Sequence, residues 1–552
     1  MTFPSETPTG HGEGIEMVPP SNFTNEKEMR DSVAGVDIED SLEDPDGTLR
    51  ATKSTSDDAA GMRRMGKGQQ LIRHFRFFSI ASFTAIATAA WEIGLFVLTP
   101  ALVDGGRAGL LYSLIWNFVG FCPVYLSLAE MASMAPIAGA QYHWVSEFAP
   151  EGYQRILSYI TGWTSTIAWQ AGNALGIFLV GSLIQTTILV NNENYAFPAW
   201  QCTLLAFAAM AVAYVGNVYG AKVLPYWQNA VFAIHILGYF GYIIPIWVSA
   251  PVATHKQVWA EFQNEGGWSS VGFAVLVGQL TGISAQAGID TAAHMSEEVR
   301  NAASTIPKAM LTIYVVNFAL LLPAAVTVCY HIPDLDAALD DPTTYPSLYV
   351  LRQSMSTGWM TVILALIILM NIASNIVYLA AVTRDLFAFS RDQGLPFSGW
   401  LSKIHPKRHI PQNACILSCA IACVLALIYI GSPVAFYAIT SLLTVALLQC
   451  YCFSIGCVLW RRIAHPETLP PAQFSLGRWG VLTNTLAVLY SLWSFFWAFW
   501  PQTYPVTASG FNWASPIYVA VLLVAAVFFF YKAKNTYVGP VTEVEGRKVH
   551  VR

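Results

Sequence analysis

Long apolar segments recur along most of this chain, and they constrain its fold more than any other feature. From Phe75 onward, runs of roughly 18 to 28 residues follow one another, and each is long enough to cross about 30 Å of hydrocarbon as a helix. Backbone amides in lipid must find hydrogen-bond partners within the segment, so helices are expected, whereas membrane strands would show short alternating runs. The sequence therefore predicts an all-α integral membrane protein.

The apolar pattern predicts twelve transmembrane helices. They are expected at about 76–102, 108–133, 156–188, 199–219, 224–249, 270–294, 308–330, 358–383, 412–431, 434–460, 480–501 and 514–532.

Composition excludes the soluble alternatives. Of the 552 residues, 55 % are hydrophobic and only 11 % are charged, against roughly 25 % charged residues in a soluble domain. So few charges cannot cover a large water-facing surface, which excludes a cytosolic enzyme, a nucleic-acid binder and a secreted disulfide scaffold. The nine cysteines lie in apolar segments, where they are expected to pack rather than to form disulfides or hold a metal. No cofactor is expected.

The first 70 residues differ from the rest of the chain. They hold fourteen acidic residues against seven basic ones and contain no apolar run. Such a segment cannot bury enough surface to offset its ordering entropy, and it lacks the apolar stretch of a signal peptide. We expect a disordered acidic tail over 1–70, a twelve-span core over 71–535 and a C-terminal tail over 536–552.

Basic residues place both tails on the same side of the membrane. Twenty-six of the 29 lysines and arginines fall in the tails or in the loops after even-numbered spans, and only Arg107, Lys256 and Arg352 fall on the other side. Cytoplasmic loops carry the excess of such residues. Both termini are therefore expected in the cytoplasm.

Two acidic residues lie inside predicted spans. Glu92 is in the middle of span 1, within TAAWEIG, and Asp290 is in the second half of span 6, within GISAQAGID. A charge at mid-bilayer costs at least about 2.5 kcal/mol, and the small residues around both acids favour interrupted helices. Breaks at corresponding positions of two halves mark the substrate site of inverted-repeat transporters.

The position of the two breaks predicts a five-plus-five inverted repeat. Repeat one is expected at about 76–250, repeat two at about 270–460, and two extra spans at about 480–532.

Each acid has two interpretations. Glu92 either binds a cation or a coupled proton, or it pairs with His235, the one embedded basic candidate in the predicted spans. Asp290 either takes part in proton coupling or caps and orients the inner half-helix. A carboxylate beside the free carbonyls of a broken helix suits an ammonium group. Trp91 can stack on such a group through its ring face or simply pack.

The candidate site combines these two segments with polar residues of spans 3 and 8. Its substrate-binding candidates are Ala90, Trp91, Glu92, Gln170, Asn173, Ser284, Gln286, Gly288, Asn371 and Asn375, and its proton-coupling candidates are Glu92 and Asp290. Each polar side chain can instead join two helices, a contribution of about 0.6 kcal/mol. Gln286, inside the break of span 6, is the one favoured for binding.

Three motifs resemble those of a known family. GIDTAAHMSEEVRNAASTIPKAM occupies 288–310, EMASMAPIAGAQYHWV occupies 130–145 and RDLFAFSRDQGLP occupies 384–396. They resemble the amino acid–polyamine–organocation superfamily, and most closely the fungal amino acid/choline transporter family, which includes GABA and choline permeases. The resemblance covers about residues 70–540, and the span 6 motif is specific.

The resemblance implies a permease with discontinuous helices 1 and 6, alternating access and a proton gradient as its driving force. Many permeases of the superfamily hold the substrate carboxylate in a Gly-Ser-Gly break of span 1. Here that segment reads AAWE and ends in the acid Glu92. The departure favours a substrate whose cationic end faces span 1, such as GABA, choline or a polyamine.

We therefore expect a secondary-active, proton-coupled importer of an amine-bearing nutrient and not an enzyme. A non-transporting nutrient sensor of the same fold, a polyamine transporter and a vacuolar exporter stay open as alternatives. The plasma membrane is favoured over the vacuolar membrane. Lys27 and Lys53 lie near acids in the tail and are candidate sites for ubiquitin ligase machinery. The charged cluster at Arg384, Asp385, Arg391 and Asp392 is expected to form an inner latch or to be solvated loop charge.

Overall fold

The computed structural model describes residues 41–43, 49–51, 55–220, 223–343, 345–431, 435–508 and 510–545. Internal contacts divide the chain into two units, Met1–Thr52 and Lys53–Arg552. In the first unit, β1 (Ser41–Glu43) pairs antiparallel with β2 (Leu49–Ala51). Most of the expected acidic tail lies outside the described residues, and so do Lys27 and Lys53.

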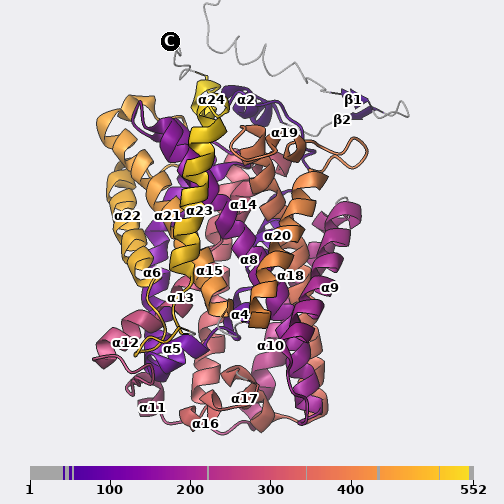
Figure 1. The fold of residues 1–552 in the computed structure, drawn as a ribbon, viewed down its shortest axis with the longest axis vertical. Helices are drawn as coiled ribbons and strands as arrows, with labels where there is room; N and C mark the ends of the chain where they lie inside the picture. The colour runs from indigo at the N-terminus through magenta and orange to yellow at the C-terminus, as the bar shows by residue number, and fades with distance from the viewer. Residues whose placement is uncertain are drawn as a thin grey trace, which may run out of the picture. The chain divides into compact units, whose positions relative to one another are not determined.

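The unit Lys53–Arg552 is an assembly of long helices (Figure 1). Ten of its described segments are long and apolar enough to cross a membrane. The first is Phe77–Val103, which contains α3 to α5. The others are built on α6 (Gly106–Met134), α8 (Gln154–Asn191), α9 (Ala199–Gly220), α10 (Leu224–Ser249), α15 (Ala302–Tyr330), α18 (Thr357–Arg391), α20 (Gln412–Gly431), α21 (Ala435–Ala464) and α23 (Ala514–Phe528). The prediction of a helical, multi-pass membrane protein is confirmed.

Shorter helices occupy the two remaining segments that the sequence predicts to be spans. The segment expected at 270–294 is divided into α12 (Val271–Gly278), α13 (Leu280–Ser284) and α14 (Thr291–His294). The segment expected at 480–501 forms α22 (Gly480–Trp497), which has 18 residues.

Both helices that the sequence predicts to be broken are interrupted. The first divides into α3 (Phe77–Thr88), α4 (Ala90–Gly94) and α5 (Thr99–Val103), and Ala89 between α3 and α4 has φ 40°. This left-handed conformation turns the chain out of the helix. In the second, six residues separate α13 from α14, and Gly288 among them has φ 93°.

Helix α8 packs against α18, α21, α9 and α20, and Figure 1 shows it in the interior of the helical assembly. Its glycines permit close approach: a Cβ on Gly162 would lie 2.2 Å from the Phe389 ring of α18. Trp169 of α8 is completely buried. Helix α18, which carries the predicted residues Asn371 and Asn375, is therefore held against α8.

Short elements gather at the two ends of this unit. At one end, here called the α2 end, lie α2 (Ser56–Arg64), α19 (Ser398–Leu401) and α24 (Lys534–Thr536), and at the opposite end lie α11 (His255–Trp259), α16 (Leu335–Leu339) and α17 (Pro346–Ser354) (Figure 1). Connections between long helices accordingly alternate between the two ends.

Residues 55–70 differ from the disordered segment that composition predicts. Thr55 caps α2, because its hydroxyl accepts a hydrogen bond from the Asp58 amide at 3.2 Å. Acids lie in the first turn of α2 and arginines in the last, as the helix dipole favours. The Asp58 carboxylate in turn accepts bonds from the Asn301 and Ala302 amides at the start of α15. These contacts to the core offset the ordering entropy.

Candidate functional site

A small cavity lies beside the two helix breaks. Its volume is about 90 Å³, enough for several water molecules or a small ligand. Fifteen residues from the segments of the two broken helices and from α8, α18 and α21 line it, and five of them carry polar side chains: Thr88, Ser284, Ser374, Asn375 and Tyr378. Of the predicted binding residues, Ser284, Gly288 and Asn375 line this cavity.

Two glycines of α8 make room for the polar side chains of α18. A Cβ on Gly172 would lie 2.0 Å from the Tyr378 hydroxyl oxygen, and a Cβ on Gly176 would lie 2.3 Å from the Asn375 amide oxygen. Because both glycines line the cavity, a side chain at either would displace the groups that can bind a ligand there.

Glu92 faces α10 rather than the cavity. Its Oε1 lies 2.5 Å from Nδ1 of His235, and both residues are almost completely buried. Glu92 Oε2 and His235 Nε2 are buried without a hydrogen-bond partner among the described residues. The structure thus places Glu92 with His235, as one of the two interpretations expects.

Trp91 is completely buried against the same helix. The centroid of its ring lies 5.9 Å from that of His235, 5.8 Å from that of Tyr239 and 6.1 Å from that of Tyr242. The aromatic side chains therefore enclose the acid–histidine pair, and the Trp91 ring is not a lining group of the cavity.

Asp290 joins three helices. Its Oδ1 accepts a hydrogen bond at 2.5 Å from the Tyr451 hydroxyl of α21, and its Oδ2 accepts one at 2.5 Å from the Gln141 amide of α7 (Ala140–Phe148). Its side chain makes no capping bond to α14. Asp290 therefore fixes the position of the inner half-helix through its neighbours.

The remaining predicted residues contact other helices or their own. Gln170 donates to the Ser418 hydroxyl at 2.8 Å and Asn173 to the Ser418 carbonyl at 3.3 Å, which joins α8 to α20. Gln286 donates to the Leu114 carbonyl at 3.0 Å. Asn371 donates within α18 to Ile367, and Ala90 is buried at the start of α4.

At the two helix breaks, several backbone carbonyls accept hydrogen bonds from side chains of other helices. The Tyr125 hydroxyl donates to the Gln286 carbonyl at 2.6 Å, the Thr281 hydroxyl to the Val97 carbonyl at 3.1 Å, and the Ser374 hydroxyl to the Ala87 carbonyl at 3.3 Å. Ser374 also lines the cavity. Because Ala87 lines it too, a ligand with a donor group can exchange with the Ser374 hydroxyl for this one acceptor.

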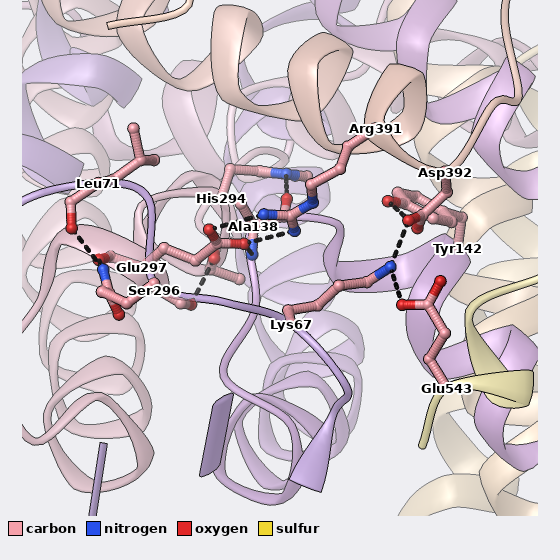
Figure 2. A network of polar contacts seen from close by, with 12 residues as sticks. Lys67, Leu71, Ala138, Tyr142, His294, Ser296, Glu297, Arg391, Asp392 and Glu543 are labelled. Carbon is pink, nitrogen blue, oxygen red and sulfur yellow. Dashed lines mark hydrogen bonds and ion pairs between the residues drawn. The ribbon is translucent and has the colours of Figure 1, made fainter. Parts of the chain in front are cut away.

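A network of ion pairs joins the elements at the α2 end (Figure 2). Arg391 makes two bonds to Glu297, of 2.8 and 3.0 Å, and Lys67 contacts both Asp392 and Glu543 at 2.6 Å. Burial alone would raise the pKa of Glu297, but the Arg391 guanidinium, the Ala138 amide and the Arg73 charge together hold that pKa below its usual value. Burial lowers the pKa of Lys67, but the Asp392 and Glu543 carboxylates together more than reverse this effect, and the pKa is raised.

Further ion pairs extend this network. Arg384 contacts Glu298 at 2.7 Å, and Arg64 contacts Glu147 at 2.7 Å. Three of the four charged residues expected to form a latch thus pair across elements. The fourth, Asp385, is buried and accepts a bond from Ser165 at 2.8 Å.

Several residues of this arrangement carry no distinct signal in the sequence. Tyr378 and Ser374 line the cavity, and Gln141 and Tyr451 hold Asp290, yet each lies in an apolar or mixed segment with no feature of its own. Gln141 does fall within the 130–145 motif that supports the family resemblance, which is the one signal that marked its segment.

Comparison with known proteins decides the family. The profile described as amino acid permease matches residues 75–524, which contain both broken helices and every residue of the candidate site. The chain belongs to the amino acid permease family. This permease is similar to a Macrophomina phaseolina protein named for amino acid/polyamine transport, with 28 % identity over 76 % of this chain and 94 % of that protein.

Two relatives from Saccharomyces cerevisiae carry more specific names. The choline transporter is 25 % identical over 85 % of this permease and 83 % of its own length. The GABA-specific permease is 24 % identical over 90 % of this permease and 88 % of its own length. As a permease, the protein is a transporter and not an enzyme.

Proposed function

We propose that this permease imports an amine-bearing nutrient by proton-coupled, secondary-active transport. The observation that carries the proposal is the cavity of about 90 Å³ beside two interrupted helices, whose mostly apolar lining includes hydroxyl, amide and phenol groups. Helix interruptions within a membrane create binding sites for small ligands. The names of the relatives support substrates with an amino or quaternary ammonium group.

Alternating access in this proposal uses twelve spans with a five-plus-five inverted repeat. The α2 end faces the cytoplasm, and both termini lie there, because 26 of the 29 basic residues fall in the tails or in the loops after even-numbered predicted spans. The ion pairs at the α2 end close the inner side. The plasma membrane is the proposed location, and the vacuolar membrane is the alternative.

Proton coupling is assigned to the Glu92–His235 pair, with Asp290 as a second candidate. One proton moves on or off the pair as the substrate site fills, since Glu92 Oε2 and His235 Nε2 have free hydrogen-bonding capacity. Glu92 lies on α4 and His235 on α10, and Ile93, the residue after Glu92, lines the cavity. A change in protonation is thus connected to the cavity through adjacent residues of α4.

Uptake into reconstituted vesicles tests this proposal. Labelled GABA, choline, polyamines and amino acids are offered at two external pH values, and accumulation of at least one is expected to rise at the lower external pH and to collapse with a protonophore. Glu92→Gln should lower accumulation at least about tenfold and leave downhill exchange intact. The exposed Glu151 gives the matched control Glu151→Gln, which should accumulate normally. Concentrative uptake by Glu92→Gln would refute the coupling role.

A nutrient sensor of the same fold is the competing function. It would bind a labelled amine with saturation and show no flux into vesicles at any proton gradient. We also propose that ubiquitin ligase machinery acts on the N-terminal tail; conversion of Lys27 and Lys53 to Arg should slow internalisation of the permease and leave its uptake rate per molecule unchanged.

A further inference from the structure

A large groove opens on the outside of the helical assembly, away from the cavity between the breaks. Its volume is about 470 Å³, within the range of small-molecule sites. Residues of α8, α21, α22 and α23 line it, together with η4 (Phe529–Ala533), the π-helical turn that follows α23. Such turns interrupt regular helices and often occur at functional sites.

The lining is almost entirely apolar. Aromatic and aliphatic side chains such as Phe453, Leu492, Phe495 and Leu522 form its walls. The few polar groups are already paired: the Tyr518 hydroxyl donates to Gln449, and the Tyr159 hydroxyl donates to the Ala525 carbonyl at 3.1 Å. With apolar walls and paired polar groups, the groove suits a hydrocarbon chain.

The dimensions of the groove fit one leaflet. Along α23 and η4 its lining runs from Tyr518 to Phe530, which is about 18 Å at a rise of about 1.5 Å per residue. The hydrocarbon core is about 30 Å thick. The groove therefore covers roughly half of the core, on the half nearer the α2 end.

Three cationic residues lie near the α2 end of the groove. The Arg155 guanidinium lies 5.6 Å from the centroid of the Phe529 ring and donates to the Ala533 carbonyl at 3.1 Å. Its Nε is buried without a hydrogen-bond partner among the described residues. Lys532 and Lys534 are exposed on the same turn. These three cations complement a phosphate or carboxylate at headgroup depth.

We propose that this groove binds an anionic phospholipid of the cytoplasmic leaflet. One acyl chain lies along α23 between α8, α21 and α22, and the headgroup meets Arg155, Lys532 and Lys534. The inference rests on the orientation proposed above. The Ser158 and Tyr537 hydroxyls are hydrogen-bonded at 2.8 Å, and Glu543 contacts Lys67 in the ion-pair network. A lipid that packs against the turn after α23 therefore also stabilises the C-terminal segment.

Photolabelling of the reconstituted full chain tests the site. Phosphatidylserine and phosphatidylcholine, each with a diazirine on the acyl chain, are compared in vesicles, and labelled peptides are mapped by mass spectrometry. Labels are expected on α8, α21 and α23, with phosphatidylserine favoured. Loss of each cation in Arg155→Gln, Lys532→Gln and Lys534→Gln should lower that preference about fivefold and leave chain labelling by phosphatidylcholine in place.

A matched pair of tryptophan variants separates the groove from the general lipid surface. Ala526 lines the groove, whereas Val527 is 69 % exposed on α23 and does not line it. Ala526→Trp should lower labelling at least about fivefold, and Val527→Trp should not. If Ala526→Trp does not fold, the charge variants carry the test.

Three results would overturn the lipid site: equal labelling by the two phospholipids, displacement of phosphatidylserine by a sterol at equal mole fraction, or crosslinks between two copies of the chain at the groove. The assay measures no transport, so its failure leaves the uptake proposal standing, and loss of uptake leaves the lipid site standing.

Discussion

Asp104 is a buried acid outside the membrane-spanning segments, and its protonation affects folding. The residue follows α5 and is 1 % exposed. Burial raises its pKa to about 7, and the Trp268 side chain offsets only part of that rise. An unfolded aspartate has a pKa of about 3.9. Between these values the folded chain keeps a proton that the unfolded chain releases, so stability falls as pH rises, by about 1.4 kcal/mol per pH unit.

This pH dependence predicts the behaviour of Asp104→Asn. The variant lacks the titrating group, so its advantage over the natural chain should grow from pH 5 to pH 7 and then level off. Unfolding temperatures in detergent across this range measure the difference. Asp336 is exposed on α16, and Asp336→Asn should show no such trend. A constant difference between Asp104→Asn and the natural chain would contradict the assignment.

At the residue level, the sequence predicts correctly those features that follow from the free-energy cost of placing a charge in the membrane. A carboxylate within a span must be enclosed and paired, and Glu92 and Asp290 are both buried and hydrogen-bonded. Which of several partners each acid takes depends on the rotation of its helix against its neighbours. That rotation is set by packing of the whole assembly, so the choice of His235 over the cavity was not contained in the local pattern.

At the scale of elements, the interruption of α3 is made without glycine. Ala89 has φ 40° and ψ 50° and is 2 % exposed. An L-residue in this conformation costs about 1–2 kcal/mol. Small residues around the acid indicated that span 1 is broken, but every alanine of the segment looks alike in the sequence. The exact residue that turns left-handed was therefore not predictable.

The strain at Ala89 predicts opposite effects for the same substitution four residues apart. Ala89→Gly relieves about 1–2 kcal/mol of strain and loses about 0.8 kcal/mol of methyl burial, so stability should stay equal or rise slightly. Ala85 is buried inside α3, and Ala85→Gly should lose about 2 kcal/mol, since glycine weakens a helix interior. Chemical unfolding in detergent compares the two. Equal losses would show that Ala89 is not strained.

At the scale of the whole molecule, the apolar segments of the sequence predict most of the helices. They predict much less of the candidate site. Ten predicted spans match long helices, because length and hydrophobicity alone select them. The cavity instead takes Thr88, Asn375 and Leu443 from helices far apart in the chain. No local pattern reports which faces of α3, α18 and α21 converge, and the two α8 glycines that permit the approach resemble packing glycines elsewhere.

Within the network at the α2 end, a single residue near the start of the described core, Lys67, contacts the segment near its C-terminal end. Lys67 contacts Asp392, which follows α18, and Glu543, which lies in the C-terminal segment, and both contacts measure 2.6 Å. The Lys67 side chain is 7 % exposed and the Asp392 side chain 5 % exposed. Removal of the cation from a buried pair leaves an uncompensated charge, which costs about 3–5 kcal/mol.

Lys67→Gln should therefore loosen the segment 55–75 and the segment 537–545 together. Hydrogen exchange in lipid nanodiscs is expected to increase in both segments by at least about tenfold, because both lose their shared contact. Exchange in α11, α16 and α17, at the opposite end of the assembly, should stay unchanged. Lys308 is exposed near the same end, on α15, and Lys308→Gln should leave exchange as it is. If only one of the two segments responds, Lys67 is not the link between them, and closure of the α2 end depends on the Arg391–Glu297 and Arg384–Glu298 pairs instead.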